Sequence, residues 1–433
     1  MRYFSTRDTL KKNAFSLKEC AFRGLAPDGG LFMPESIPQA DMNEVQRLAD
    51  ISFADMASYL ASLFFGEEIE KELLDSLVRK AFNFPCPLVK IGDNDYALEL
   101  FHGPTSAFKD FGARFMGGML GLLKKQETEE KLFVLTATSG DTGSAVAAGF
   151  HNVAGIDVVV LYPNGKVSNL QESQMTTLGG NIHPIRVNGT FDDCQSLVKQ
   201  LFNDSVFREN CKVTSANSIN ILRWIPQSFY YFYGWCQWHQ QTGLSHPDIT
   251  IPSGNYGNAT AGLLASQMGL PVNRFIVASN ANDVVPKYLV SGSYEPKTSI
   301  HTIANAMDVG APSNFERMTY LFQNDFNLIS SSIQGFSSED KEIREAIRNL
   351  YEKFGYISDP HSACGWNAAQ YYQAQGFRLC TAHAAKFHEV IEDTIGVKPP
   401  VPETLKRAMQ KEKHFTSLPN DVQILKDFIL SLQ

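Results

Sequence analysis

Strand-like and helix-like segments alternate through most of this 433-residue chain, and this alternation constrains the fold more than any other feature of the sequence. Apolar runs typical of buried strands occupy residues 132–137, 157–162, 181–187, 249–252 and 274–279. Helical patterns separate them, one beginning near residue 142 and others covering 167–178, 191–203 and 258–269. Because strands that alternate with helices form parallel sheets with crossover helices, we predict an α/β fold with open, twisted parallel sheets.

The first part of the chain departs from this pattern. Residues 42–63 and 67–82 carry apolar side chains at helical spacing, and no strand pattern is evident between them. Residues 84–87, Phe-Pro-Cys-Pro, then break the helical pattern and indicate a boundary. We predict three parts, which are a helix-rich N-terminal region at 1–92, a smaller α/β domain at 93–220 and a larger α/β domain at 221–433.

The composition is that of an ordinary globular protein with a large core, since 43% of the residues are hydrophobic and 19% are charged. The net charge of −8 argues against nucleic acid or an anionic membrane as the main partner, because either would favour a basic surface. An anionic small substrate remains compatible with this charge, since a single pocket can be basic on an acidic protein.

The seven cysteines are odd in number and widely spaced, and no Cys-x-x-Cys pair occurs. This pattern favours free thiols in a reducing compartment over a disulfide framework or a zinc site. The N-terminus lacks an apolar signal core, and no run of 18 apolar residues is present to cross a membrane. We therefore expect a cytoplasmic protein without membrane association and without a bound metal.

Two predicted strand-to-helix turns are rich in small and hydroxyl side chains. Residues 136–143 are Thr-Ala-Thr-Ser-Gly-Asp-Thr-Gly, and residues 251–258 are Ile-Pro-Ser-Gly-Asn-Tyr-Gly-Asn. The first N–H groups of a helix have no partner within it, so such turns bind phosphate or carboxylate groups well. The alternative is that these residues serve only as helix caps and turn formers. Neither the glycine-rich nucleotide signatures nor a zinc-protease or Gly-x-Ser-x-Gly motif identifies a ligand.

A third segment places a lysine among aromatic side chains. Lys109 lies between Phe108 and Phe111 in residues 102–111, His-Gly-Pro-Thr-Ser-Ala-Phe-Lys-Asp-Phe. Partial desolvation lowers the pKa of a lysine and frees its amine as a nucleophile, which suits Schiff-base chemistry. The alternative is an ordinary helical lysine whose ammonium reaches solvent.

These segments together resemble the threonine synthase family. Residues 102–111 are similar to its cofactor-lysine segment, 138–143 to its substrate loop, 253–258 to its cofactor-phosphate loop and 381–383 to its pyridine-facing segment. Further matches lie at 161–168, 215–220 and 305–309, so that the resemblance runs from about residue 24 to about residue 387 in family order. The long N-terminal region resembles the enterobacterial and fungal branch of the family.

The resemblance implies a fold-type II pyridoxal-phosphate enzyme of the tryptophan-synthase-β-like group. The implied reaction converts O-phospho-L-homoserine and water to L-threonine and phosphate by γ-elimination and β-addition, with pyridoxal 5'-phosphate as cofactor and no obligate protein partner. Three alternatives stay open at this point. They are a threonine-synthase-like phospho-lyase, a serine or threonine dehydratase, and a catalytically silent ligand-binding protein.

The resemblance also assigns the cofactor site. Lys109 would carry the cofactor as a Schiff base and move protons during catalysis, and Thr381 would face the pyridine nitrogen. The cofactor phosphate would be held by Gly254, Asn255, Tyr256, Gly257 and Asn258. Two of these depart from the family pattern, since Tyr256 stands where Phe is usual and Asn258 where Asp is common. Asn still caps helices, so we expect cofactor binding to persist.

For the substrate, the resemblance assigns the carboxylate to Ser139, Gly140, Asp141, Thr142 and Gly143. Asp141 would repel a carboxylate, so we expect its side chain to cap its own helix. The substrate phosphate requires fixed positive charge, for which Lys166 and Arg114 are the candidates. For Arg114 a structural salt bridge is the alternative. Residues 359–362 either line the pocket or cap a helix that has Pro at its first position.

Overall fold

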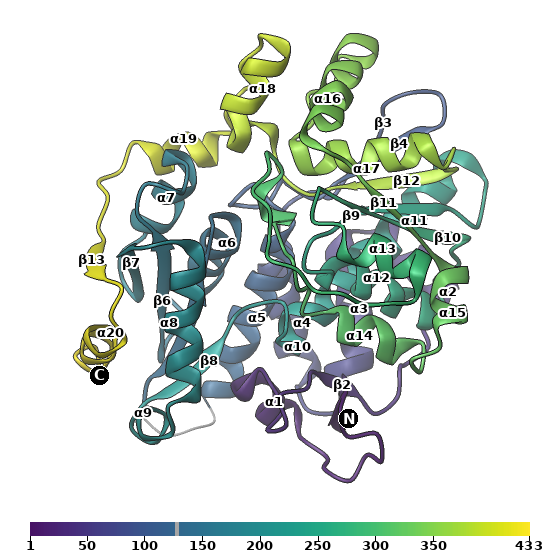
Figure 1. Cartoon of the computed structure of the whole chain (residues 1–433). Coiled ribbons are helices and arrows are strands. Elements are labelled where there is room, and N and C mark those ends of the chain that lie inside the picture. Colours follow the sequence, from purple (N-terminus) through teal and green to yellow (C-terminus); the bar gives the residue numbers. More distant parts are fainter. Residues whose placement is uncertain (126–129) are drawn as a thin grey trace.

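The computed structural model describes residues 1–125 and 130–433. The larger of its two main sheets contains β3 (Leu88–Lys90), β4 (Asp95–Glu99), β9 (Asp248–Pro252), β10 (Arg274–Ser279), β11 (Ile333–Ser337) and β12 (Gly376–Cys380). Their spatial order is β11-β10-β9-β12-β4-β3, and each neighbouring pair is parallel except β3 and β4. These strands lie on the right in Figure 1.

The smaller sheet is parallel throughout. It contains β5 (Leu132–Ala137), β6 (Ile156–Pro163), β7 (Ile182–Asn188), β8 (Lys212–Ser215) and β13 (Thr416–Pro419). Their order is β13-β7-β6-β5-β8, on the left in Figure 1. The predicted α/β fold with two parallel-type sheets is therefore confirmed.

The chain crosses between the two sheets more often than the predicted domain boundaries suggest. Strand β4 precedes every strand of the smaller sheet along the chain, yet it pairs with β12 in the larger sheet. Strand β13 lies close to the C-terminus, yet it pairs with β7 in the smaller sheet. The segment after β4, which contains Lys109, therefore leads directly from one sheet to the other.

Both sheets contribute one face to a common core. Alternate residues of a strand face opposite sides of its sheet. In the smaller sheet Val134 and Val158 pack into the central core, whereas Leu135 and Val159 pack into an outer core. In the larger sheet Ile251 and Val277 face the central core, while Ile276 and Ala278 face outward. Burial on both faces explains why the strands appear in the sequence as continuous apolar runs.

Helices cover the outer faces. Helices α8 (Phe191–Asn203) and α20 (Val422–Leu430) pack on the smaller sheet, and α16 (Asp340–Phe354) and α17 (Pro360–Tyr371) on the larger. Helices α5 (Lys109–Lys124), α6 (Asp141–Phe150), α11 (Phe229–Thr242) and α12 (Gly257–Gln267) contribute to the central core and its surroundings. The remaining helices between the sheets' strands are α7 (Asn169–Thr176), α9 (Ser205–Asn210), α10 (Ile221–Trp224), α13 (Val284–Ser291), α14 (Phe315–Leu321), α15 (Phe326–Ser332), α18 (His388–Ile395) and α19 (Glu403–Met409).

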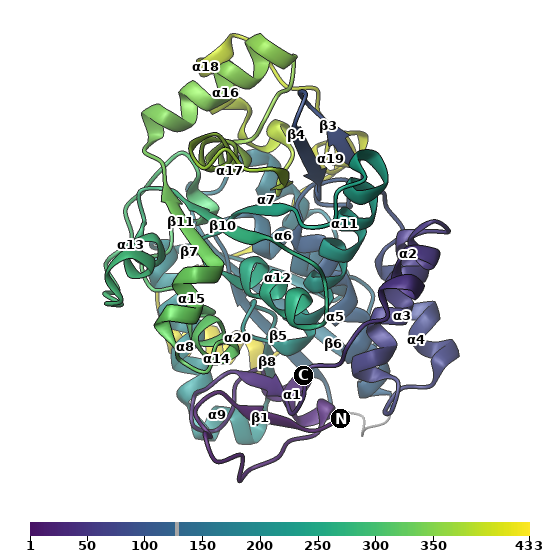
Figure 2. The same ribbon diagram turned by 90° about the vertical axis from the view of Figure 1, so that its right-hand side faces the viewer.

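The N-terminal region is helical, and it also contains a two-stranded ribbon that its sequence pattern did not predict. Its elements are β1 (Tyr3–Ser5), α1 (Leu17–Arg23), β2 (Phe32–Pro34), α2 (Met42–Ala49), α3 (Phe53–Phe65) and α4 (Lys71–Ala81). The helical pattern predicted across 42–63 is broken at Ser52, whose side chain caps α3 by accepting from the N–H of Asp55. Figure 2 shows α2, α3 and α4 together on one flank of the molecule.

An aromatic cluster packs this region against α5. The ring of Phe111 lies 5.5 Å from Phe53, 5.8 Å from Phe82 and 4.9 Å from Phe84, measured between ring centroids. Aromatic pairs at this separation add to the stability gained from burial alone. The N-terminal region thus holds in place the helix whose first residue is Lys109.

Two sequence expectations concern the whole chain. All seven cysteines are free, as their spacing predicts, and all are buried. Within residues 1–125 and 130–433, no helix combines the length and apolar character required to cross a membrane.

Candidate active site

Three neighbouring strands of the larger sheet end at one edge. The pairing of Gly376 with Asp248 and of Cys380 with Glu99 puts the carboxyl ends of β9, β12 and β4 level with one another. The segment 253–258 follows β9, Thr381 follows β12, and the segment leading to Lys109 follows β4. Parallel sheets of α/β proteins bind ligands at this edge. The predicted cofactor-binding segments therefore converge.

The lysine segment is a tightly bonded turn. Asp110, which is fully buried, accepts hydrogen bonds from the N–H and the hydroxyl of Thr105 at 2.8 and 2.7 Å. A Cβ at Gly103 would overlap the Asp110 carboxylate, so only glycine fits there. Ser106 takes a left-handed conformation with φ 56°. This turn determines where α5 begins and hence where Lys109 lies.

Lys109 is adjacent to Thr381. The N–H of Phe108 donates to the carbonyl oxygen of Thr381 at 2.8 Å, and Ala107 forms a bridge with Ala382. Burial lowers the pKa of Lys109 to about 8, which confirms the desolvation expected from its sequence context. The residue as a whole is partly exposed, so Lys109 lies at the edge of the core and not within it.

The charged side chains around Lys109 have opposing effects on its pKa. The nearby Asp141 carboxylate raises the pKa of Lys109, whereas Lys386 and Arg223 lower it. Sequence reasoning did not single out Lys386 or Arg223, and both are buried. The sequence context of Lys386 resembles that of Lys109 and could have indicated a buried lysine. Lys386 lies among apolar residues in Ala-Ala-Lys-Phe, close after Thr381.

The segment 253–258 forms the start of α12. Tyr256 is the residue before the helix and takes a left-handed conformation with φ 60°. Within the described chain, no hydrogen bond to another backbone group engages the N–H groups of Gly254, Asn255, Tyr256 or Gly257. A Cβ at Gly254 would overlap the backbone of Met307, so the close packing of this loop requires glycine. Free N–H groups at a helix N-terminus fit a phosphate.

Hydrogen bonds of side chains stabilise the conformation of this loop. Asn258 donates from Nδ2 to the carbonyl of Pro252 at 2.9 Å and accepts from the Ser253 hydroxyl and the Ala259 N–H. Asn255 donates to the hydroxyl of Ser218 at 2.7 Å. Asn258 therefore supports the turn from within the first turn of α12, and not as the expected helix cap, since the residue before the helix is Tyr256 and no described side chain caps it.

The hydroxyl of Tyr256 makes a hydrogen bond of 2.7 Å with Ser279 at the end of β10. A phenylalanine at this position could not form it. Because Tyr256 is 1% exposed, an unpaired hydroxyl there would be costly, and Ser279 supplies the partner. The two departures from the family pattern are thus each satisfied within the fold.

A buried carboxylate, Asp359, joins two parts of this site. It caps α17, and Pro360 is the first residue of that helix. It accepts from the Ser362 hydroxyl, whose oxygen in turn accepts from the N–H of Thr381 at 3.0 Å. Its Oδ1 also lies 2.8 Å from Nδ1 of His361, and His361 accepts at Nε2 from the N–H of Ala306. The helix-cap interpretation of residues 359–362 is confirmed.

The predicted substrate loop lies at the carboxyl end of β5. Its glycines shape the turn, since the N–H groups of Gly140 and Gly143 both donate to the Thr138 hydroxyl, at 2.9 and 2.8 Å. Gly140 has φ 147°, and a Cβ there would overlap the side chain of Gln171. The backbone donors of Gly140 and Gly143 are therefore engaged within the loop. The half-buried residues Ser139 and Thr142 remain as the loop's accessible polar groups.

The side chain of Asp141 does not cap its own helix as expected. The residue before α6 is Gly140, and no side chain in the described part of the chain caps that helix. Asp141 instead forms an ion pair of 2.6 Å with Lys386 and accepts from Nε2 of Gln171 at 2.8 Å. Burial alone would raise its pKa, but Lys386 and Lys109 hold the pKa of Asp141 below its ordinary value. Asp141 is therefore an ionised carboxylate inside the site.

The two candidates for the substrate phosphate have different environments. Arg114 donates to the carbonyls of Ala81 and Lys80 and to Asn83, so its guanidinium secures the end of α4. These contacts engage Nε and Nη2 of Arg114, and its role in binding the substrate phosphate stays a prediction. The contacts differ from the salt bridge that was its alternative, because two of the three acceptors are backbone carbonyls and the third is a neutral amide.

Lys166 is exposed in the turn after β6, three residues before α7 begins. Strand β6 pairs with β5, and Leu161 lies opposite Ala137, so this turn neighbours the substrate loop. Helix α7 also carries Gln171, which contacts Asp141. The helix starts later than its pattern predicts, because Ser168 supplies the cap.

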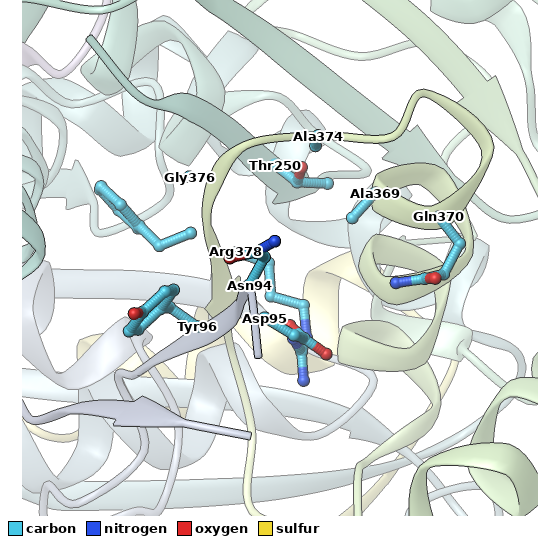
Figure 3. A pocket seen from close by; sticks show the side chains of 10 residues that line it. Asn94, Asp95, Tyr96, Thr250, Ala369, Gln370, Ala374, Gly376 and Arg378 are labelled. Carbon is cyan, nitrogen blue, oxygen red and sulfur yellow. The ribbon is translucent and has the colours of Figure 1, made fainter. Parts of the chain in front are cut away.

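A small cavity of about 30 Å³ lies at the opposite, amino-terminal edge of the larger sheet. Figure 3 shows Arg378 beside Asp95, with Tyr96, Thr250 and Gln370 around them. Arg378 forms an ion pair with Asp95, and its Nε and Nη2 have no hydrogen-bond partner among the described residues. The volume suits a water molecule and not a substrate.

Family models match almost the entire chain. The model for pyridoxal-phosphate dependent enzymes matches residues 86–378. The models for the threonine synthase N terminus and the threonine synthase C-terminal part match residues 2–82 and 362–429.

Individual relatives agree with these matches. A threonine synthase of Haemophilus influenzae is 42% identical over 411 residues, which cover 94% of this chain and 95% of that protein. The solved structure of a threonine synthase from Brucella melitensis with bound pyridoxal phosphate has a TM-score of 0.93 at 34% identity and covers 100% of this chain and 99% of its own. The threonine synthase structure from Escherichia coli has a TM-score of 0.91 at 38% identity and covers 100% of both chains.

Proposed function

Since the chain belongs to the threonine synthase family of pyridoxal-phosphate enzymes, we propose that it acts on O-phospho-L-homoserine with the cofactor held at Lys109. The activity is that of a threonine synthase, a lyase that forms L-threonine and phosphate. The observation that carries the site assignment is the convergence of Lys109, Thr381 and the segment 253–258 at one sheet edge.

The residues present fit the cofactor. The N–H groups at the start of α12 suit its phosphate, and Lys109 offers a desolvated amine for covalent attachment. The Thr381 hydroxyl would face the pyridine nitrogen, where it cannot donate a proton as a carboxylic acid could. When bound, the cofactor supplies an electron sink for negative charge that develops on the substrate carbons.

Lys109 would move protons at Cα and Cβ of the substrate. A group whose pKa lies near the working pH serves both as base and as acid, and a pKa of about 8 meets this condition. An ordinary lysine would be almost fully protonated at neutral pH and therefore a poor base.

The substrate would span both sheets. Its carboxylate would bind at the start of α6, to the backbone donors of Asp141 and Thr142 and to the side chains of Ser139 and Thr142. Its phosphate would bind Lys166 in the neighbouring turn. The backbone of Gly140 and Gly143 would hold the loop in shape and would not bind the substrate directly.

The direct test is incubation of the purified holoenzyme with O-phospho-L-homoserine, reading threonine and phosphate in parallel. We expect equal amounts of both products and no turnover by Lys109→Ala. Phosphate released without threonine would overturn the proposal in favour of a phospho-lyase.

The assignment of Lys166 is tested with Lys166→Ala. A charge-assisted hydrogen bond contributes roughly 1.5–3 kcal/mol, so kcat/KM should fall by about 10- to 100-fold. The dissociation constant of the cofactor should not change, because its phosphate binds elsewhere. A change in cofactor affinity with unchanged kcat/KM would show that the two phosphate sites are reversed.

A further inference from the structure

The ion pair between Asp141 and Lys386 is deeply buried in the proposed site. The two side chains are 4% and 0% exposed, and the Lys386 ammonium lies 2.6 Å from Oδ1 of Asp141. The ammonium also donates to the carbonyl oxygen of Thr105 at 2.8 Å. Lys386 therefore links the turn before Lys109 to the loop that begins α6.

This arrangement resolves a conflict of charge. The start of α6 has the free backbone donors that suit a carboxylate, but Asp141 places a negative charge within the same turn. Like charges at a few ångströms repel strongly where water is excluded. An ionised Asp141 without a partner would therefore oppose the substrate's carboxylate.

We propose that Lys386 is a positioning residue for substrate recognition, which neutralises Asp141 and so allows the start of α6 to accept the substrate's carboxylate. This inference rests on the proposed function, because it assigns the carboxylate to that turn. Lys386 acts through Asp141 and does not touch the substrate, since its ammonium is bonded to Asp141 and Thr105 and its side chain is fully buried.

The test compares two ligands that differ only in the carboxylate. O-phospho-L-homoserine carries it, whereas 3-aminopropyl phosphate keeps the amine and the phosphate but lacks it. In Lys386→Met we expect KM for O-phospho-L-homoserine to rise by about 10- to 100-fold, which corresponds to about 1.4–2.8 kcal/mol at 1.4 kcal/mol per tenfold. The inhibition constant of 3-aminopropyl phosphate should change by less than about threefold.

A second measurement does not depend on turnover. The dissociation constant of L-homoserine, read from the visible absorbance of the holoenzyme, should rise in parallel with KM. Lys426→Met provides the matched control, because Lys426 also pairs with a carboxylate, Asp204, but lies outside the site. This control should leave both ligands unaffected.

The double variant Asp141→Asn with Lys386→Met distinguishes neutralisation of Asp141 from other roles of Lys386. If Lys386 acts by neutralising Asp141, removal of both charges restores binding of the carboxylate ligand to within a few-fold of wild type. If Lys386 instead binds the substrate itself, or holds the two sheets together through the ion pair, the double variant stays impaired and the inference is wrong.

Loss of one partner of a buried ion pair often destabilises the fold, so Lys386→Met is checked by thermal unfolding. If Lys386→Met does not fold, the binding of L-homoserine by Asp141→Asn alone tests the inference. It should bind L-homoserine at least as tightly as wild type, and weaker binding would overturn the inference.

Equal weakening of both phosphate ligands in Lys386→Met would also overturn the inference while leaving the proposed function intact. A wild-type enzyme that makes no threonine would refute the proposed function itself.

Discussion

The pH dependence of covalent cofactor capture measures the state of the Lys109 amine directly. Only the neutral amine attacks the cofactor's aldehyde. With a pKa of about 8, about 9% of Lys109 is neutral at pH 7. For an ordinary lysine with a pKa of about 10.4 the neutral fraction is about 0.04%, so burial enriches the reactive form by roughly 200-fold.

The assay mixes cofactor-free protein with pyridoxal phosphate over about pH 6–11 and follows the visible band that borohydride abolishes. Because the neutral form of Lys109 is favoured by burial, the capture rate should rise with pH, reach half its maximum near pH 8 and then level off. N-acetyl-lysine methylamide, reacted under the same conditions, supplies the reference for a solvated amine.

Two variants give the sign of each neighbouring charge. Asp141 stabilises the ammonium form of Lys109, so Asp141→Asn should move the midpoint to lower pH. Lys386 repels that ammonium, so Lys386→Met should move the midpoint to higher pH. A wild-type midpoint that coincides with the reference amine would refute the argument from burial.

Three further substitutions test the rest of the cofactor site. Gly254→Ala should weaken cofactor binding by about tenfold or more, measured by equilibrium dialysis, because the new Cβ would overlap Met307; unchanged affinity would contradict the tight loop. Thr381→Asp should divert the enzyme toward transamination, detected as keto-acid product, and an unchanged product distribution would argue against contact with the pyridine nitrogen. Asp359→Ala should lower cofactor affinity and shift the holoenzyme's visible spectrum, since Ser362 would no longer be held against Thr381, whereas a loss of thermal stability without a spectral change would indicate a purely structural role.

The positions of the strands and of the segments around them were predictable because they depend on short-range sequence patterns. Strand β5 lies at the residues predicted for it, since buried parallel strands are continuous apolar runs. The ribbon of β1 and β2 was not predictable in this way. Its strands are three residues each and pair across almost thirty residues, so neither carries a periodic signal. The break at Ser52 was visible as a serine three residues before Asp55, but the apolar pattern continued through it.

The site residues also differ in whether their contacts are close or distant in the sequence. The lysine turn and the segment 253–258 each contain short-range hydrogen bonds, such as Asp110 with Thr105 and Asn258 with Ser253, and the sequence pattern identified both segments. Arg114 was assigned by its closeness to Lys109 along the chain, yet its acceptors are the carbonyls that end α4. Lys386 was missed because its partner, Asp141, lies far away in sequence and belongs to the other sheet's loops. Contacts of this kind depend on how the two sheets meet.

The distribution of buried charge is compatible with the proposed anionic substrate, although the protein as a whole is acidic. The chain carries a net charge of −8, but the interior beside the proposed site holds three cations, Lys109, Lys386 and Arg223, and two carboxylates, Asp141 and Asp110. Burying an ion costs several kcal/mol unless it is paired, so this excess of positive groups is expensive for the fold alone. It would become favourable when the substrate's carboxylate lies beside it, because opposite charges attract more strongly where water is excluded. Burial lowers the pKa of Lys109 most, and Lys386 and Arg223 lower it further, so cations that would favour anionic ligands also favour the neutral form of the proposed catalytic amine.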